Sequence, residues 1–152
     1  MHRTSILIIL TGAAVVLSIS ALAQNAGKSA EVTYQDGHKE VHHKIFNAHA
    51  GDIAYAHAVD DFHGASLDLP RLKIDTIEKI DFVDMTADDQ AKYPKDMDPN
   101  FIRKGNVTFS SRKKLDGIFL GVGMIRFDDE ETHGDLITPK VSAVRFLLSS
   151  RK

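Results

Sequence analysis

Six histidines lie close together in one stretch of the sequence, and imidazole is a common ligand for zinc, copper and nickel. Four of them share odd parity, so they would lie on the same side of strands that run without a bulge. These four candidate ligands for a Zn or Cu ion are His43, His49, His57 and His63. The other two are His38 and His42, and Asp60 or Asp61 could add a carboxylate.

The metal site depends on a hairpin at Gly51-Asp52, which would place His57 across from His43 and His49. Two plainer explanations of the cluster stay open, namely adventitious metal affinity and histidines exposed on a polar strand face. The spacing from His38 to His42 also differs from the helical zinc motif, in which Glu directly follows the first His.

Motifs for nucleophilic or phosphate chemistry are missing from the sequence. It contains no cysteine and no Gly-x-Ser-x-Gly elbow. Gly121-Val122-Gly123 is read as a tight turn, because no helix pattern follows it. A calcium loop opening at Asp96 fails at Phe101, where glycine is required. The acidic run at residues 128–131 is read as a solvated loop, although paired carboxylates leave a small hydrolase open.

The elements that must position these residues read as short β-strands. Apolar bursts at Val32-Thr33-Tyr34, residues 41–46 and residues 53–59 are separated by the turn signals Asp36-Gly37 and Gly51-Asp52. Short runs at about 10-residue spacing predict an all-β sandwich or barrel.

The same order of features recurs in the second half of the chain. The matched segments are 32–34 with 107–109, 45–46 with 118–119, 63–64 with 133–134, 70 with 139, and 77–82 with 141–146. The offset falls from 75 to 64 residues, as expected for a shorter second copy. The alternative is a single β-domain whose strands are similar by coincidence.

Each copy resembles a small SH3-like or Sm-like barrel. The Asp36-Gly37 turn and the terminal Ile77-x-x-Ile80-x-Phe82 strand carry this resemblance. It implies a bent five-stranded sheet that closes on itself, and it implies no particular function. The predicted fold is therefore mostly β, with two tandem small barrel-like (SH3/Sm-like) or sandwich-like β repeats and a short helical connection.

Five segments follow from this organisation. They are a signal peptide at 1–23, a disordered start at 24–30, a first β repeat at 31–84, a connection at 85–105 and a second β repeat at 106–152. Thr86 is read as the N-cap of a short helix that ends before Pro94.

The first 23 residues read as a secretory signal. A basic start is followed by an apolar run at 6–19 and by Ala21-Leu22-Ala23, which predicts cleavage between Ala23 and Gln24. The protein is then secreted or periplasmic, with no stable membrane anchor after cleavage. An uncleaved anchor is the alternative, because residues 5–23 carry no charge.

The composition argues against one class of function, nucleic-acid binding. The chain is slightly acidic, with a formal net charge of −2, so it has no electrostatic footprint for nucleic acid. The leading hypothesis is an exported, soluble, non-catalytic binding or scaffold module of the cell envelope. Its partner would be an envelope or secreted protein, contacted by strand addition or in a groove. The alternatives are a periplasmic metal-binding protein that uses the histidine cluster and a small secreted hydrolase.

Overall fold

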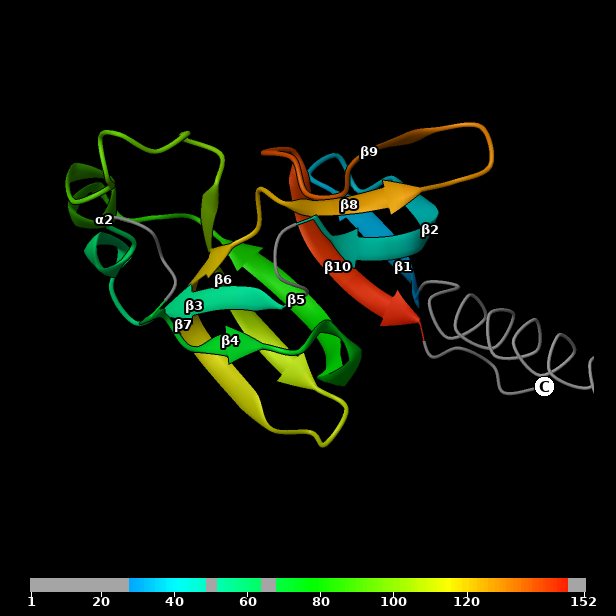
Figure 1. The fold of residues 1–152 in the computed structure, drawn as a ribbon, viewed down its shortest axis with the longest axis horizontal. Helices are drawn as coiled ribbons and strands as arrows, with labels where there is room; N and C mark the ends of the chain where they lie inside the picture. Colours follow the sequence, from blue (N-terminus) through cyan, green and yellow to red (C-terminus); the bar gives the residue numbers. More distant parts are fainter. Residues whose placement is uncertain (1–27, 49–51, 64–67, 148–152) are drawn as a thin grey trace, which may run out of the picture.

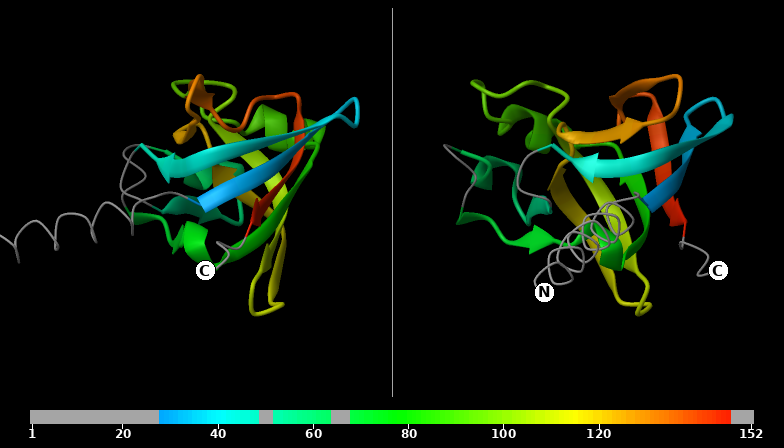
Figure 2. Two further views of the ribbon diagram at one scale, coloured as in Figure 1. Left: turned by 90° about the vertical axis from the view of Figure 1, so that its right-hand side faces the viewer. Right: turned by 45° about the vertical axis from the view of Figure 1, so that its right-hand side comes forward.

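The computed structural model describes residues 28–48, 52–63 and 68–147, and it shows one antiparallel sheet of ten strands. The sheet curves into a half-barrel (Figure 1, Figure 2). Its strands are β1 (Lys28–Tyr34), β2 (Lys39–Asn47), β3 (Ile53–Ala56), β4 (Arg71–Leu72), β5 (Ile77–Val83), β6 (Ile102–Phe109), β7 (Lys114–Gly121), β8 (Ile125–Asp128), β9 (His133–Asp135) and β10 (Val141–Leu147). The mostly β prediction is confirmed. The predicted signal peptide lies outside the described residues.

Counting β1–β5 as one set and β6–β10 as a second, the strands met outward from the central β5–β10 pair come in the same order on both sides: a first, a second, a third and a fourth strand. On one side of it lie β6, β7, β3 and β4, and on the other side lie β1, β2, β8 and β9. At the centre Ile80 pairs with Val144, and the repeat pattern matches these two residues with each other. Ile80 also lies opposite Val107, just as Val144 lies opposite Val32.

Backbone irregularities occur at matching places on the two sides. The turn after β1 holds Gly37 at φ 88°, and the turn after β6 holds Arg112 at φ 68°. In the two strands that follow, Lys44 has φ 50° and Gly117 has φ 64°. Both of these residues lie where the pairing register shifts, so each strand carries a β-bulge at the corresponding point.

The finer expectation of two tandem SH3-like or Sm-like barrels is not confirmed, because strands from both halves join in one continuous sheet. The expected hairpin at Gly51-Asp52 is wrong. β3 pairs with β4 and β7, whereas β2 pairs with β1 and β8. β1 begins at Lys28, within the segment that was expected to be a disordered start.

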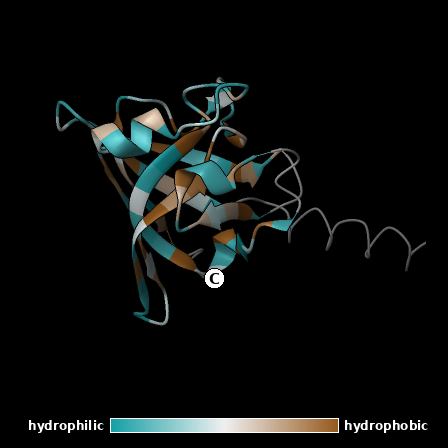
Figure 3. Ribbon diagram, turned by 90° about the vertical axis from the view of Figure 1, so that its left-hand side faces the viewer, coloured by the Kyte–Doolittle hydropathy of each residue, from teal (hydrophilic) through white to brown (hydrophobic). Residues whose placement is uncertain are grey.

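The main core lies against the sheet and draws on both halves of the chain. Val32, Ile80, Val107 and Val144 are fully buried in it. Hydrophobic and hydrophilic residues alternate along parts of the sheet, as in β1, where one face is buried (Figure 3). β3 and the end of β7 are instead buried on both faces. One hydrophobic core therefore holds both halves together.

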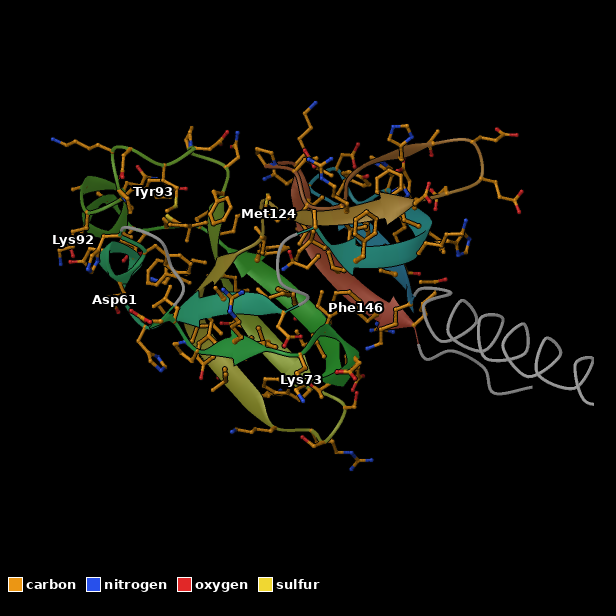
Figure 4. All side chains as sticks on the ribbon, viewed as in Figure 1. Asp61, Lys73, Lys92, Tyr93, Met124 and Phe146 are labelled. Carbon is orange, nitrogen blue, oxygen red and sulfur yellow. The ribbon has the colours of Figure 1, made fainter. Side chains whose placement is uncertain are left out.

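A second, smaller core lies under the connection between β5 and β6. The 3-10 helix η1 (Val59–Asp61) contributes Val59 to it, the helix α2 (Ala87–Ala91) precedes Tyr93, and Figure 4 shows Asp61, Lys92 and Tyr93 at the same end of the molecule. Phe62 is fully buried, with Tyr93 packed against the same cluster. Because of this packing, the connection is part of the folded body.

The helix cap expected at Thr86 is confirmed. The Thr86 hydroxyl accepts a hydrogen bond from the Asp89 amide at 3.1 Å, and the Asp89 carboxylate accepts one from the Thr86 amide at 3.0 Å. Such a reciprocal capping box satisfies two amides that the first helical turn leaves without partners. Among the described residues, no helix is long and apolar enough to cross a bilayer.

Gly123 allows the connection to pack against the β7–β8 turn. A Cβ at this position would lie 2.7 Å from Cδ2 and 3.1 Å from Cα of Phe101. We expect Gly123→Ala to lower the free energy of unfolding by about 1–3 kcal/mol, because Phe101 must shift. Gly134→Ala is the control, since its Cβ would lie 3.7 Å from the Phe127 ring. Urea unfolding measures both, and equal changes would contradict the steric explanation.

Candidate functional site

The histidines predicted to bind a metal lie on separate elements. His43 is on β2, and its Nδ1 lies 2.7 Å from the Ser29 hydroxyl. His57 follows β3, and His63 follows η1 with its Nδ1 2.7 Å from the Asp60 carbonyl. His49 lies outside the described residues.

The pairing that was to join these histidines does not form. Five strands separate β2 from β3 in the sheet order, so His43 and His57 are not ladder neighbours. Within the ranges that the structure describes, no three histidine, aspartate or glutamate side chains are arranged to hold a metal ion. Zn or Cu binding through the four histidines stays a prediction.

The even-numbered histidines instead form a chain of alternating carboxylates and imidazoles. Its members in order are Asp36, His38, Glu40, His42 and Asp129. The successive nitrogen–oxygen distances are 2.5, 3.5, 3.2 and 2.8 Å. Asp129 comes from the acidic run that was expected to be a solvated loop. The chain therefore attaches the β8–β9 hairpin to β2.

Aromatic rings support this chain on the sheet. The His42 ring stacks on Phe127 at a centroid distance of 3.9 Å, and the His38 ring stacks on Tyr34 at 4.2 Å. The Tyr34 hydroxyl donates to Glu40 at 3.0 Å. Burial and this hydrogen bond raise the pKa of Tyr34 to about 12.

The histidine contacts favour the charged form of the carboxylates. A hydrogen bond with the His38 ring lowers the pKa of Asp36, and a hydrogen bond from Tyr34 lowers the pKa of Glu40. Burial alone would raise the pKa of Asp129. Hydrogen bonds with the His42 ring and from the His43 amide outweigh burial and lower that pKa.

We expect this series of paired carboxylates and imidazoles to stabilise the fold when the pH lies above the pKa values that its acids have in the unfolded state. A carboxyl group whose pKa is lower in the folded state stabilises it fully above the unfolded pKa, which is 3.8 for Asp and 4.5 for Glu. That stability is lost as the pH falls through the lower, folded-state pKa. Asp129→Asn should therefore flatten the loss of stability that sets in as the pH falls below the unfolded pKa of 3.8. Asp128→Asn, at the last residue of β8 and next to Asp129, is the control, and urea unfolding through this acid range measures both.

A cavity of about 450 Å³ lies between the connection and the start of β6. Its apolar wall includes Val83, Met85, Pro99 and Pro139, and Arg103, Asn100 and Gln35 add polar groups. Tyr93, another lining residue, holds the wall in place. Its hydroxyl donates to the Asp98 carbonyl at 2.6 Å and accepts from the Ile102 amide at 3.1 Å.

Arg103 is the most constrained charged group of the cavity wall. Its Nη1 donates to the carbonyls of Thr138 at 3.0 Å and Val141 at 2.7 Å. The guanidinium carbon lies 4.1 Å from the centre of the Phe82 ring, which is a cation–π distance. Burial lowers the pKa of Arg103, and the negative charge of Asp84 opposes that shift.

Lys28 makes the corresponding contacts in the other half of the molecule. Its Nζ donates to the carbonyls of Ile74 at 2.9 Å and Ile77 at 3.3 Å, and it lies 5.3 Å from the centre of the Phe146 ring. Lys28 and Arg103 are 75 residues apart, which is the offset between the first strands of the two matched segments. A search for charged residues separated by this offset was the one sequence signal that could have identified Arg103.

Lys104 is the second cation of the cavity wall, and it is already paired. Its Nζ lies 2.7 Å from the Asp89 carboxylate, and both side chains are largely buried. This contact lowers the pKa of Asp89.

The chain matches no protein-family model, no curated protein and no solved structure. An inference about its function therefore depends on the residues described above.

Proposed function

We propose that this protein is an exported, non-catalytic binding module whose ligand occupies the cavity beside Arg103. The cavity is the observation that carries the proposal. Its volume of about 450 Å³ is in the range of ligand sites, and it combines apolar walls with a few polar groups. The proposed partner is an envelope or secreted molecule, because the signal peptide predicted at residues 1–23 would export the protein.

The module consists of two copies of a five-stranded unit. The symmetric strand order, the matched bulges and the corresponding contacts of Lys28 and Arg103 support this assignment. In this arrangement the last strand of each copy pairs with the first strand of the other. That exchange explains why the copies share one sheet and the main core.

Groove contact is favoured over strand addition. The outermost strands are β4, with two residues, and β9, with three. Short edge strands offer few backbone groups to an incoming strand and are a common protection against edge pairing.

Binding is also favoured over hydrolysis at this cavity. The Lys104 ammonium is held by Asp89, and the Tyr93 hydroxyl makes two backbone hydrogen bonds. Neither group is therefore positioned as a general acid or base beside a nucleophile.

A fragment screen followed by backbone amide NMR tests the proposed function. Fragments should shift the amides of Met85 and Asn100, which line the cavity. Val83→Trp should fill the space and abolish these shifts. Val41→Trp is the matched control, because Val41 is 49% exposed on β2 and Val83 is 37% exposed. If no fragment binds at the cavity, or if Val83→Trp binds as before, the proposal is wrong.

Export is tested separately by sequencing the N-terminus of the protein recovered from its native cell. Cleavage predicts Gln24 as the first residue. A chain that keeps residues 1–23 would contradict it.

A further inference from the structure

We infer that the ligand of this cavity carries a carboxylate that binds Arg103 and, next to it, an apolar group that contacts the cavity wall. The inference rests on the proposed function and adds the chemical class of the ligand. A free organic acid and the C-terminal end of a peptide share this chemistry.

The comparison between Lys28 and Arg103 shows which part of the Arg103 side chain the fold needs and which part it leaves over for a ligand. Both side chains bridge two backbone carbonyls and lie over a phenylalanine ring. Lys28 does so with a single nitrogen, so the bridging role does not require a guanidinium. Arginine at position 103 provides more donors than that role uses.

The additional donors belong to a residue that lines the cavity. A guanidinium carries five N–H groups, of which Nη1 has two and Nε and Nη2 have three. Within the described part of the chain, Nη1 is the only Arg103 nitrogen with hydrogen-bond partners, and Arg103 forms no ion pair. A carboxylate fits such a planar set of donors with two parallel hydrogen bonds.

The two cations of the cavity wall differ in their partners. Asp89 pairs with Lys104, whereas Arg103 has no ion-pair partner among the described residues. Asp84 also lines the cavity and is close enough to affect the Arg103 pKa, but it forms no ion pair with the guanidinium. Replacing Asp84 should therefore strengthen the binding of an anion.

The apolar part of the ligand follows from the other walls. Val83, Met85, Pro99 and Pro139 offer no charged side chain to a ligand. A hydrocarbon or aromatic group attached to the carboxylate would bury against them, and a purely polar anion would leave them exposed to water.

The experiment compares two acids with their uncharged amides. The probes are phenylacetate against phenylacetamide, and acetyl-alanyl-phenylalanine with a free against an amidated C-terminus. NMR titration of the full chain follows the cavity amides and the Arg103 Nε–H. We expect the acids to bind with a Kd on the order of 1 mM or tighter, and the amides to bind at least about tenfold more weakly. Preference for one acid identifies the source of the carboxylate.

Two variants assign the effect to the guanidinium. Arg103→Lys keeps a cation at the carbonyl bridge and should weaken acid binding by about tenfold or more. Lys28→Arg makes the opposite exchange outside the cavity and should leave binding unchanged. Asp84→Asn gives a second readout that does not alter Arg103, and it should tighten acid binding without affecting the amides.

The outcomes separate the inference from the proposed function. Acids and amides that bind equally well at the cavity, or an Arg103→Lys variant that binds acids as the native protein does, overturn the carboxylate inference and leave a binding cavity. The same holds if other fragments occupy the cavity and the acids do not. A cavity that takes up no probe and no fragment overturns both.

Discussion

Replacing Phe146 with alanine is expected to lower the free energy of unfolding by about 3–5 kcal/mol. Phe146 lies on β10 and is 3% exposed, packed in the main core. Lys28 also lies over its ring. Its removal leaves a cavity in the core beside β1 and takes away the aromatic face under a cation, so two stabilising contacts are lost together. Urea or thermal unfolding followed by circular dichroism measures the effect.

Phe82→Ala is the matched comparison, because Phe82 holds the corresponding position on β5. Its ring is only partly buried and lies under Arg103. We therefore expect a smaller loss for Phe82→Ala than for Phe146→Ala, since less apolar surface returns to water. An equal or larger loss at Phe82 would show that the difference in burial does not control these two sites.

Local pattern was enough to locate most strands, because alternation and turn residues act within a few positions. The Asp36-Gly37 turn and the Thr86 cap are both found where expected. The pairing of β3 with β7 was not predictable in the same way. It depends on contacts between residues more than 60 positions apart, and no turn signal records them.

The candidate sites show a similar division. The odd-numbered histidines were grouped by strand parity, and the bulge at Lys44 breaks that parity within β2. His42 was visible as a histidine, but its partner Asp129 is 87 residues away and looked like part of a solvated acidic loop. Arg103 was passed over because its neighbours in sequence carry no motif. Its significance comes from the carbonyls of Thr138 and Val141, which only the fold brings to it.

The second large effect on stability is expected from removing the cation that bridges two backbone carbonyls at position 103. Arg103→Met should lower the free energy of unfolding by about 2–3 kcal/mol, because two hydrogen bonds from a charged donor are lost. Lys28→Met should have a smaller effect in the same direction, since one of its two bonds is longer, at 3.3 Å. Arg103→Lys should recover most of the loss, because an ammonium makes the same bridge at position 28. Urea unfolding of the three variants measures these differences.

Lys79→Met is the control for the loss of a basic side chain. Lys79 is on β5 and pairs with Asp81 at 2.7 Å in a setting open to solvent, where an ion pair contributes little stability. If Arg103→Met and Lys28→Met destabilise no more than Lys79→Met, the carbonyl bridges do not stabilise the fold. If both destabilise and Arg103→Lys does not, the structural role of position 103 is met by a lysine. The additional guanidinium donors are then free to serve the ligand.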